Sequence, residues 1–227
     1  WRRMRTFIIA EAGSCHDSVF DKAVGLIDVA KDAGADACKF QFWSSAKRLA
    51  ERRHALKYLP IYEQYAMPAE WLPRLRATCN TRGIEFMVTA YLPEDIDVVA
   101  PYVQRFKVAS FEAGDVAFLR AHADYGKEII VSTGMAPTLR LPPGPVALLH
   151  CVSAYPTPFD QANLRAIQAP YHGYSDHTAC IYTGAFAVCA GARILEVHIK
   201  DWATSKTNPD VAAALDPKQF EEYVRLV

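Results

Sequence analysis

Eight short apolar runs recur along the chain, and most of them are apolar at nearly every position. Apolar runs of this length are typical of strands that are buried on both faces, as in a parallel sheet. The runs occupy residues 6–13, 35–41, 83–90, 105–110, 127–133, 145–151, 171–176 and 192–199.

Helical patterns separate most of these runs. In residues 20–34 apolar side chains recur at helical spacing and a glycine ends the pattern. Similar patterns cover residues 68–83, 115–126, 178–192 and 216–227. The alternation of eight strands with helices predicts a compact α/β fold, a single (β/α)8 TIM barrel domain over residues 1–227. An open doubly wound sheet is the alternative, but no glycine-rich phosphate-binding turn follows the first run.

Two connections depart from a regular barrel. Residues 134–145 contain four prolines, so we expect the helix after strand 5 to be reduced or missing. Residues 42–68 carry basic side chains without a clear apolar stripe, which predicts a long loop with at most one short helix. Within it, residues 43–66 are a candidate lid that leaves from the catalytic face. A solvated loop, or a helix packed on a second subunit of a homodimer, explains the pattern equally well.

Composition narrows the possible partners. The chain has 227 residues, 51% of them hydrophobic, and its 25 basic and 25 acidic side chains give a net charge near zero. This balance gives no indication of nucleic acid or an anionic membrane as a partner. There is no apolar run of about 18 residues and no secretory signal pattern. The six cysteines form no CxxC pair, so we expect a reduced, cytoplasmic protein.

Polar side chains follow the apolar part of every predicted strand. The carboxyl ends of barrel strands carry the active site. Stability alone does not explain polar side chains at the strand ends, because a buried polar group without a hydrogen-bond partner costs about 1–3 kcal/mol. The side chains are Glu11, Lys39, Gln41, Thr89, Lys107, Ser110, Glu112, Ser132, Thr133, His150, Ser153, Tyr155, Ser175, Asp176, His177, Glu196 and His198.

Two subsets of these residues indicate chemistry. His177 and His198 end consecutive strands and are candidates to share a metal ion, although one histidine on an apolar strand is more often a satisfied core residue. Lys39 and Lys107, with the serines around them, are suited to a phosphate and a carboxylate. Plain ion pairs with Glu11 and with the glutamate at 112 explain the lysines as well. We also expect substrate contacts from Gln41, Thr89 and Asp176.

Longer stretches carry a family resemblance that covers nearly the whole chain. They are "IIAEAGSCH", "AGADACKFQ", "GIEFMVTAY", "FKVASFE", "IIVSTGMA", "LLHCVSAYPTP", "NLRAI", "GYSDHT" and "LEVHI", in this order from residue 8 to about 199. With them the chain resembles the sialic acid synthase family. The resemblance implies a (β/α)8 barrel enzyme that condenses phosphoenolpyruvate with an N-acylated sugar to give a nonulosonic acid and phosphate.

The resemblance also implies roles for individual residues. His177 and His198 match the histidines that bind a divalent metal, usually Mn²⁺. The residues that match the phosphoenolpyruvate site are Lys39, Lys107, Ser110, Ser132, Ser153 and Ser175. Those that match polar groups near the acceptor sugar and the metal are Glu11, Glu112, Tyr155 and Asp210.

Departures from the family pattern fall on the acceptor side. Cys15-His16 followed by Ser18 stands where the family has Asn-His before Gly, and Val211 and Ala212 replace basic residues. The loop after strand 2 is shorter. The family's C-terminal antifreeze-like domain, which reaches into a partner's site, does not follow in this sequence. We therefore expect an intact phosphoenolpyruvate and metal half and an altered acceptor half, so the acceptor need not be N-acetylmannosamine.

The expected chemistry assigns a task to each group. The metal would polarise the acceptor aldehyde while the lysines and serines orient phosphoenolpyruvate. Glu112 would stabilise the cationic C2 or assist the attacking water, and Glu11 would direct that water or hold the acceptor. We expect residues 43–66 to cover the site, with Lys47, Arg48, Arg52 or Arg53 meeting an anionic substrate. Two alternatives remain, another metal-dependent barrel aldolase or isomerase and a non-catalytic relative that binds a sugar or a phosphate.

Overall fold

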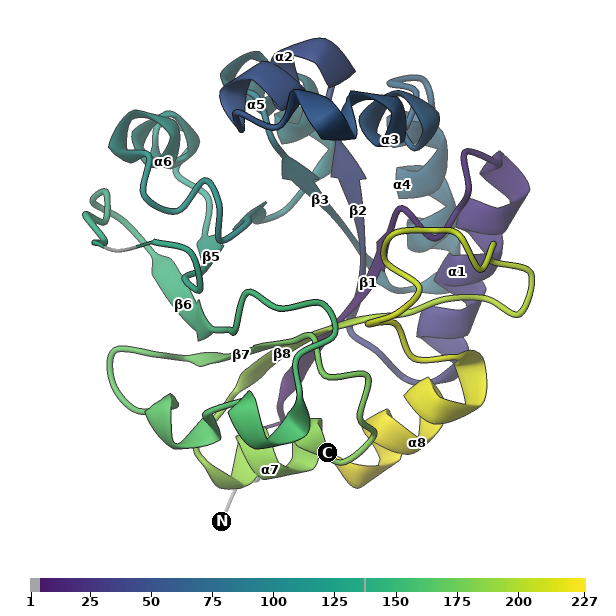
Figure 1. Cartoon of the computed structure of the whole chain (residues 1–227), viewed down its shortest axis with the longest axis vertical. Helices are drawn as coiled ribbons and strands as arrows, with labels where there is room; N and C mark the ends of the chain where they lie inside the picture. Colours follow the sequence, from purple (N-terminus) through teal and green to yellow (C-terminus); the bar gives the residue numbers. More distant parts are fainter. Residues whose placement is uncertain (1–4, 137) are drawn as a thin grey trace.

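A closed barrel of eight parallel strands in sequence order forms the centre of the molecule (Figure 1). The computed structural model describes residues 5–136 and 138–227. β1 pairs with both β2 and β8, which closes the sheet and confirms the predicted (β/α)8 fold. The strands are β1 (Phe7–Gly13), β2 (Ala37–Phe42), β3 (Glu85–Ala90), β4 (Phe106–Val108), β5 (Ile129–Ser132), β6 (Val146–His150), β7 (Gly173–Asp176) and β8 (Ile194–His198).

Most strands are followed by a helix that packs outside the barrel (Figure 1). The helices are α1 (Phe20–Asp32), α2 (Ala46–Arg52), α3 (Leu59–Gln64), α4 (Trp71–Arg82), α5 (Pro93–Val99), α6 (Val116–Ala123), α7 (Thr183–Cys189) and α8 (Pro217–Leu226). α5 was not predicted, because seven residues are too few for an apolar stripe to stand out from the sequence. No described helix is long and apolar enough to cross a membrane.

The outer layer is incomplete beside β5 and β6. The described residues between β5 and β6 form no helix, as the prolines predicted, although residue 137 lies outside the described part. Between β6 and β7 the chain makes only two 3₁₀ turns, η3 (Phe159–Gln161) and η4 (Leu164–Ala166). The missing helices shorten the chain without breaking the ring of strands.

The segment after β2 corrects the sequence prediction. It was expected to be a loop with at most one short helix, but it contains α2, α3 and a 3₁₀ turn, η1 (Leu56–Tyr58), between them. Its helices are too short to show a stripe, and their buried residues, Leu49 and Ala50, both lie on α2. Trp43, Leu49, Tyr91 and Leu92 form a small separate hydrophobic cluster there.

Side-chain alternation along the strands positions the site. Ile9 packs inside the barrel, in the interior cluster with Met87 and Ile130, whereas Ile8 packs against the helices. Because alternate residues of a strand share a face, Glu11 follows Ile9 into the interior at the carboxyl end. By the same rule Thr89 follows Met87, and the strand ends together fill the top of the barrel with polar groups.

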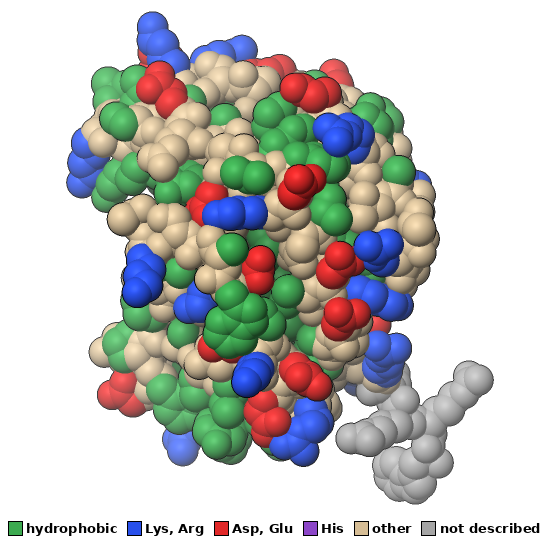
Figure 2. Space-filling view, turned by 90° about the vertical axis from the view of Figure 1, so that its right-hand side faces the viewer, with side chains coloured by type: hydrophobic (Ala, Val, Ile, Leu, Met, Phe, Trp, Pro, Cys, Tyr) green, Lys and Arg blue, Asp and Glu red, His purple; other side chains and the backbone are tan. Residues whose placement is uncertain are grey.

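The surface shows charges of both signs. On the face drawn in Figure 2, Lys and Arg side chains alternate with Asp and Glu side chains, and no large area of one sign forms. This agrees with the net charge near zero.

Candidate active site

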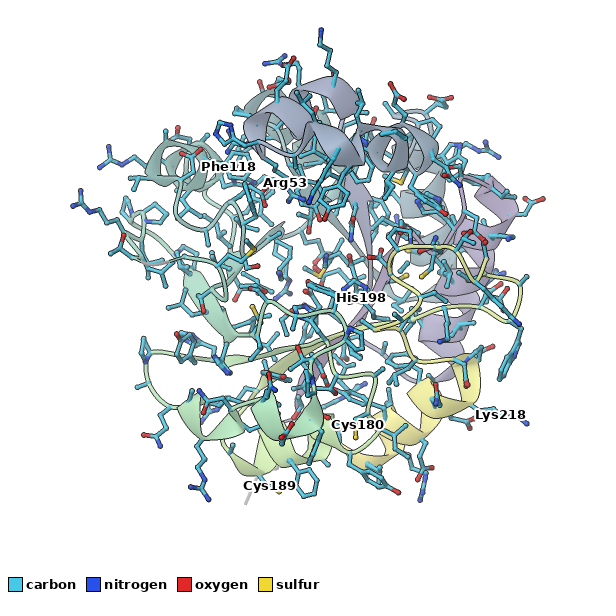
Figure 3. All side chains as sticks on the ribbon, in the orientation of Figure 1. Arg53, Phe118, Cys180, Cys189, His198 and Lys218 are labelled. Atoms are coloured by element: carbon cyan, nitrogen blue, oxygen red, sulfur yellow. The ribbon has the colours of Figure 1, made fainter. Side chains whose placement is uncertain are left out.

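A cavity of about 380 Å³ opens at the carboxyl ends of the strands. In Figure 3, His198 lies near the centre of the barrel and Arg53 lies on the side of α2. The predicted site residues that line the cavity are Glu11, Lys39, Gln41, Lys107, Ser110, Ser132, Tyr155, Ser175, His177, His198 and Asp210. Residues from six strands and from the α2–α3 segment therefore meet in one space.

The cavity floor holds two buried lysines with Glu196 between them. The Glu196 carboxylate lies 3.3 Å from Lys107 Nζ and 3.6 Å from Lys39 Nζ. Lys107 also donates to Ser132 Oγ at 2.8 Å, and Ser175 Oγ donates to Glu196 at 3.0 Å. Burial would raise the pKa of Glu196, but the two lysines outweigh it and lower it to about 2. Glu196 is therefore an anion that holds both cations in place.

Lys39 has a second carboxylate partner. Its Nζ lies 2.6 Å from Glu11 Oε2 and donates to Thr89 Oγ1 at 3.0 Å. Gln41 donates to the other Glu11 oxygen at 2.9 Å. Burial would lower the pKa of Lys39, but Glu11 and Glu196 outweigh that effect and raise it. Burial is the larger effect at Lys107, where it lowers the pKa of the ammonium group.

His177 is oriented from both sides of its ring. Nδ1 lies 2.8 Å from the carbonyl oxygen of Val152, which can only accept, so Nδ1 carries the proton. The lone pair of Nε2 then accepts from the Tyr155 hydroxyl at 2.9 Å. Burial, with His198 as a further cause, lowers the pKa of His177 to about 4. The ring is thus a neutral imidazole, the form that binds metals.

The separation of the two histidines allows the predicted divalent metal, held partly by substrate or water. Their ring centres lie 5.8 Å apart, below the roughly 6.5 Å reached when two rings bind one ion from opposite sides with bonds near 2.1 Å. His198 Nδ1 is buried without a hydrogen-bond partner among the described residues. In the described part of the chain, no group of three His, Cys, Asp or Glu side chains forms a metal cluster. The donor set is therefore two imidazoles, with the Tyr155 hydroxyl as a competitor for His177.

Asp210 reaches the cavity wall from the β8–α8 loop. Ser14 donates to Asp210 Oδ2 from both its backbone N–H and its hydroxyl, each at 2.8 Å. Gly13 has a φ of +52°, and a Cβ atom there would overlap Asp210 Oδ2. Glycine at this position therefore permits both the turn and the close approach of the carboxylate.

Glu112 does not line the main cavity, although the sequence predicts it near the reacting carbon. Its carboxylate instead accepts two hydrogen bonds from Arg53, at 2.7 and 3.0 Å. Arg53 does line the cavity. The sequence placed Glu112 correctly beyond β4, but the turn after this short strand points its side chain behind Arg53.

Three other predicted contact residues do not line the cavity. Asp176, the last residue of β7, points outward between the cavity-lining Ser175 and His177, and it accepts from Thr178 and from the Tyr223 hydroxyl at 3.2 Å. Burial raises the pKa of Asp176 to about 6. Thr89 is buried beneath Lys39 and does not line the cavity. Ser153 is exposed and also lies outside the lining.

Residues 43–66 form one wall of the cavity. Trp43 donates from Nε1 to the carbonyl of Tyr62, and the wall faces the same cavity as the two histidines. Of the four basic side chains, only Arg53 lines this cavity. Lys47, Arg48 and Arg52 instead lie next to the carboxylates of Glu51, Glu94 and Asp115.

The sequence did not predict two features of the site. One is the role of Glu196 between the two lysines. The sequence places Glu196 at a strand end, and because it lies two positions before His198 on β8, both side chains point into the barrel. The other is an aromatic wall, made of Trp43, Tyr58, Tyr62, Tyr65 and Tyr91. These aromatic residues have no regular spacing that marks a shared face.

Comparison with known proteins gives consistent results. The N,N'-diacetyllegionaminic acid synthase of Legionella pneumophila is 32% identical, with 99% of this chain and 72% of that protein aligned. The N-acetylneuraminate-9-phosphate synthase of Mus musculus is 30% identical, over 97% of this chain and 69% of its own. An uncharacterised protein of Methanocaldococcus jannaschii is 32% identical, with 96% of this chain and 69% of that protein aligned.

Solved structures agree on the fold. The N-acetylneuraminic acid synthetase of Leptospira borgpetersenii, crystallised with citrate, has a TM-score of 0.85 and 30% identity, over 98% of this chain and 82% of that chain. A truncated 3-deoxy-D-arabino-heptulosonate 7-phosphate synthase from Thermotoga maritima has a TM-score of 0.73 at 15% identity. At this identity the similarity concerns the fold alone. Residues 26–227 match the model of the NeuB family. The chain therefore belongs to the NeuB family and is a sialic acid synthase-like enzyme.

Proposed function

We propose that this enzyme condenses phosphoenolpyruvate with the open-chain aldehyde of an N-acylated sugar, giving a 2-keto-3-deoxy sugar acid and phosphate. The observation that carries the proposal is the buried floor, where Lys39, Lys107 and Glu196 lie in the same cavity as His177 and His198. Membership of the NeuB family, with relatives named as nonulosonic acid synthases, supports the reaction class.

Lys39 and Lys107 are the groups that would hold phosphoenolpyruvate. An ammonium group that contacts a phosphate or carboxylate makes a charge-assisted hydrogen bond worth about 1.5–3 kcal/mol. Ser132 already accepts from Lys107, and Ser110 lines the same cavity, so hydroxyls stand beside the ammonium groups. This arrangement would fix the phosphate and carboxylate and turn C3 toward the open part of the cavity.

The charge balance of the cavity supports a divalent metal, for which we propose Mn²⁺. Among the described residues three cations line the cavity, Lys39, Arg53 and Lys107, and three carboxylates, Glu11, Glu196 and Asp210, line it as well. Glu112 already matches the charge of Arg53, so the site offers a trianionic substrate no excess of positive charge, and a divalent ion would supply it. His177 and His198 would hold the ion, and imidazole without thiolate suits manganese, iron, cobalt or zinc. Bound there, the ion would act as a Lewis acid on a carbonyl oxygen.

The bond changes follow from the substrates. C3 of phosphoenolpyruvate attacks the aldehyde carbon, whose oxygen becomes a hydroxyl after taking a proton. Water adds to C2 and gives up one proton, and the C2–O bond to phosphate then breaks as the new C2 hydroxyl passes its remaining proton to the departing phosphate, which leaves a ketone. Glu11 and Glu196 are the cavity carboxylates beside the lysines, so they replace Glu112 as the candidates to hold this water. Glu11 is the candidate to take its proton, because the low pKa of Glu196 makes that carboxylate a weak base.

The acceptor would lie between Asp210 and the aromatic wall. The Asp210 carboxylate and Gln41 offer partners to sugar hydroxyls, whereas the rings of the wall suit the apolar face and the acyl methyl group of an N-acylated sugar. Arg53 contributes a positive group on the same side, and its charge is already matched by Glu112.

Phosphate release tests the proposal. Purified enzyme is incubated with phosphoenolpyruvate and a panel of N-acylated hexoses and their 6-phosphates, after chelation and again with added Mn²⁺. We expect phosphate only when both substrates are present, with a rate that Mn²⁺ restores. Phosphate release from phosphoenolpyruvate alone, or none with any acceptor and metal, would contradict the reaction class.

A further inference from the structure

We propose that Asn208 is a positioning residue that fixes Asp210 at the cavity wall and thereby sets the affinity for the acceptor sugar. The expected effect on acceptor affinity rests on the proposed function, in which Asp210 lies beside the acceptor sugar. Its structural part depends only on contacts between two loops of the chain.

The Asn208 side chain is buried, with 3% of the residue exposed, and both of its polar atoms are bonded. Nδ2 donates to the carbonyl oxygen of Ser14 at 2.8 Å and to Asp17 Oδ1 at 2.9 Å. Oδ1 accepts from Ser14 Oγ and from the backbone N–H of Asp210, both at 3.0 Å. One amide thus joins the β1–α1 loop to the β8–α8 loop, which are more than 190 residues apart in sequence.

This pattern requires an amide. Two donors and a double acceptor are present together only in Asn or Gln among side chains that are neutral at every pH. Aspartate at position 208 would keep the shape but lose both donors, and its charge would face Asp17 and Asp210. Alanine would leave the Ser14 carbonyl and the Asp17 carboxylate without their amide partner in a buried space, which is costly.

The consequence for Asp210 is geometric. Asn208 holds the Asp210 backbone from one side, and Ser14, itself fixed by Asn208, binds Oδ2 of the Asp210 carboxylate twice. Oδ1 is then the carboxylate oxygen that a bound molecule can reach, since Asp210 lines the cavity. A carboxylate fixed in this way is ready to accept from a sugar hydroxyl without first being ordered, and preorganisation of this kind increases affinity.

Thr204 provides a matched control. It lies in the same β8–α8 loop, is buried, and donates to the carbonyl oxygen of Cys15 at 3.1 Å. It therefore joins the same two loops, and its side-chain hydrogen bonds go to Cys15 and Asp201 rather than to Ser14, Asn208 or Asp210. A variant Thr204→Val should weaken the junction of the loops and leave the Asp210 carboxylate in place.

The first experiment measures structure without substrate. Hydrogen exchange of the Ser14 amide, which donates to Asp210 Oδ2, is followed in the wild type, Asn208→Ala, Asn208→Asp, Asp210→Ala and Thr204→Val. We expect the Ser14 amide to exchange at least tenfold faster than in the wild type in Asn208→Ala, Asn208→Asp and Asp210→Ala. In Thr204→Val it should exchange near the wild-type rate. Unchanged protection in folded Asn208→Asp would overturn the positioning role, and that variant serves if Asn208→Ala does not fold.

The second experiment measures steady-state kinetics of the same variants. We expect Asn208→Asp to raise the KM for the acceptor about tenfold while the KM for phosphoenolpyruvate stays within twofold. In the Asp210→Ala background the Asn208→Asp change should add almost nothing, because both act through one carboxylate. Independent, multiplicative effects would refute the inference. A wild type inactive with every acceptor would instead refute the proposed function, and the exchange result would still decide the role of Asn208.

Discussion

Arg53 donates two hydrogen bonds to one oxygen of Glu112, from Nε at 3.0 Å and from Nη2 at 2.7 Å. The guanidinium group also lies over the rings of Tyr91 and Phe111, at 4.5 and 4.9 Å from their centres. Arg53 is thus held on three sides while it lines the cavity. Glu112, which does not line the cavity, acts on the site through this arginine.

A change at Glu112 should therefore affect stability more than chemistry. Glu112→Ala leaves a largely buried guanidinium without its partner, so we expect the free energy of unfolding to fall by about 3 kcal/mol. Glu112→Gln keeps the shape and should lower kcat less than tenfold, because no proton passes through this group. Denaturant unfolding and steady-state kinetics measure the two effects. A loss of kcat of a thousandfold or more in folded Glu112→Gln would restore Glu112 as a catalytic base.

The neighbouring arginine is the control for this prediction. Arg52 pairs with Asp115 at 2.7 Å and stacks on Phe118, but both charged side chains are partly exposed and Arg52 does not line the main cavity. We expect Arg52→Ala to lower the free energy of unfolding by about 1 kcal/mol or less and to leave turnover unchanged.

Lys107 should matter for one substrate only. Replacing Lys107 by Ala removes a charge-assisted contact, so we expect phosphoenolpyruvate to bind at least tenfold more weakly while the affinity for the acceptor changes little. Titration calorimetry measures the binding of phosphoenolpyruvate directly. Lys127, whose ammonium group bonds only to the backbone carbonyls of Ala100 and Val103 in the described structure, is the control lysine. Equal affinity in Lys107→Ala and wild type would make Lys107 a structural residue.

Stability should fall in mild acid because of His16. Burial lowers the pKa of His16 to about 4, whereas an exposed histidine titrates near 6.5. Below pH 6.5 the unfolded chain takes up a proton at this residue and the native state does not. The free energy of unfolding therefore declines as the pH falls from 6.5 toward 4.

Replacement of His16 isolates this contribution. His16 packs edge-on against Trp71, so Phe is a suitable replacement. Between pH 7 and pH 5 we expect the wild type to lose about 2 kcal/mol more than His16→Phe. Replacement of the exposed His54 should leave the decline unchanged. Parallel declines in wild type and His16→Phe would show that His16 is protonated in the native state.

Metal binding gives a prediction that does not depend on turnover. Titration of chelator-treated protein with Mn²⁺ should show one site per chain, and either His177→Ala or His198→Ala should abolish it. His122, a buried histidine on α6, is the control because it lies outside the cavity lining. Undiminished Mn²⁺ binding in both cavity variants would place the metal elsewhere.

The sequence predicted the strand ends well because the alternation of side chains determines them. Ile9 packs inside the barrel, so Glu11, two positions further along the same strand, points inward too, and the same rule relates Ser175 and His177. Asp176 was expected beside His177 in the site but does not line the cavity, since neighbours in a strand point to opposite faces. His177 and Asp176 are next to each other in sequence but belong to different layers.

Long-range and irregular contacts could not be predicted in this way. Ser14 and Asp210 are 196 positions apart and meet through two loops without periodicity. The direction of the Glu112 side chain depends on the turn after a three-residue strand. The position of α2 and α3 depends on how they pack against the barrel mouth. The spacing of apolar and polar residues along the sequence does not indicate such contacts, so only the structure reveals which loop side chains enter the cavity.

The oxygen that leaves with phosphate tests the proposed condensation most directly. Phosphoenolpyruvate is labelled with ¹⁸O in the oxygen that bridges C2 and phosphorus, and it is converted with the acceptor that supports turnover. If C3 attacks the aldehyde, water adds to C2 and the C2–O bond breaks, all of the label appears in inorganic phosphate. Label retained in the keto acid, or phosphate formed at the same rate without an aldehyde, would contradict the proposed reaction.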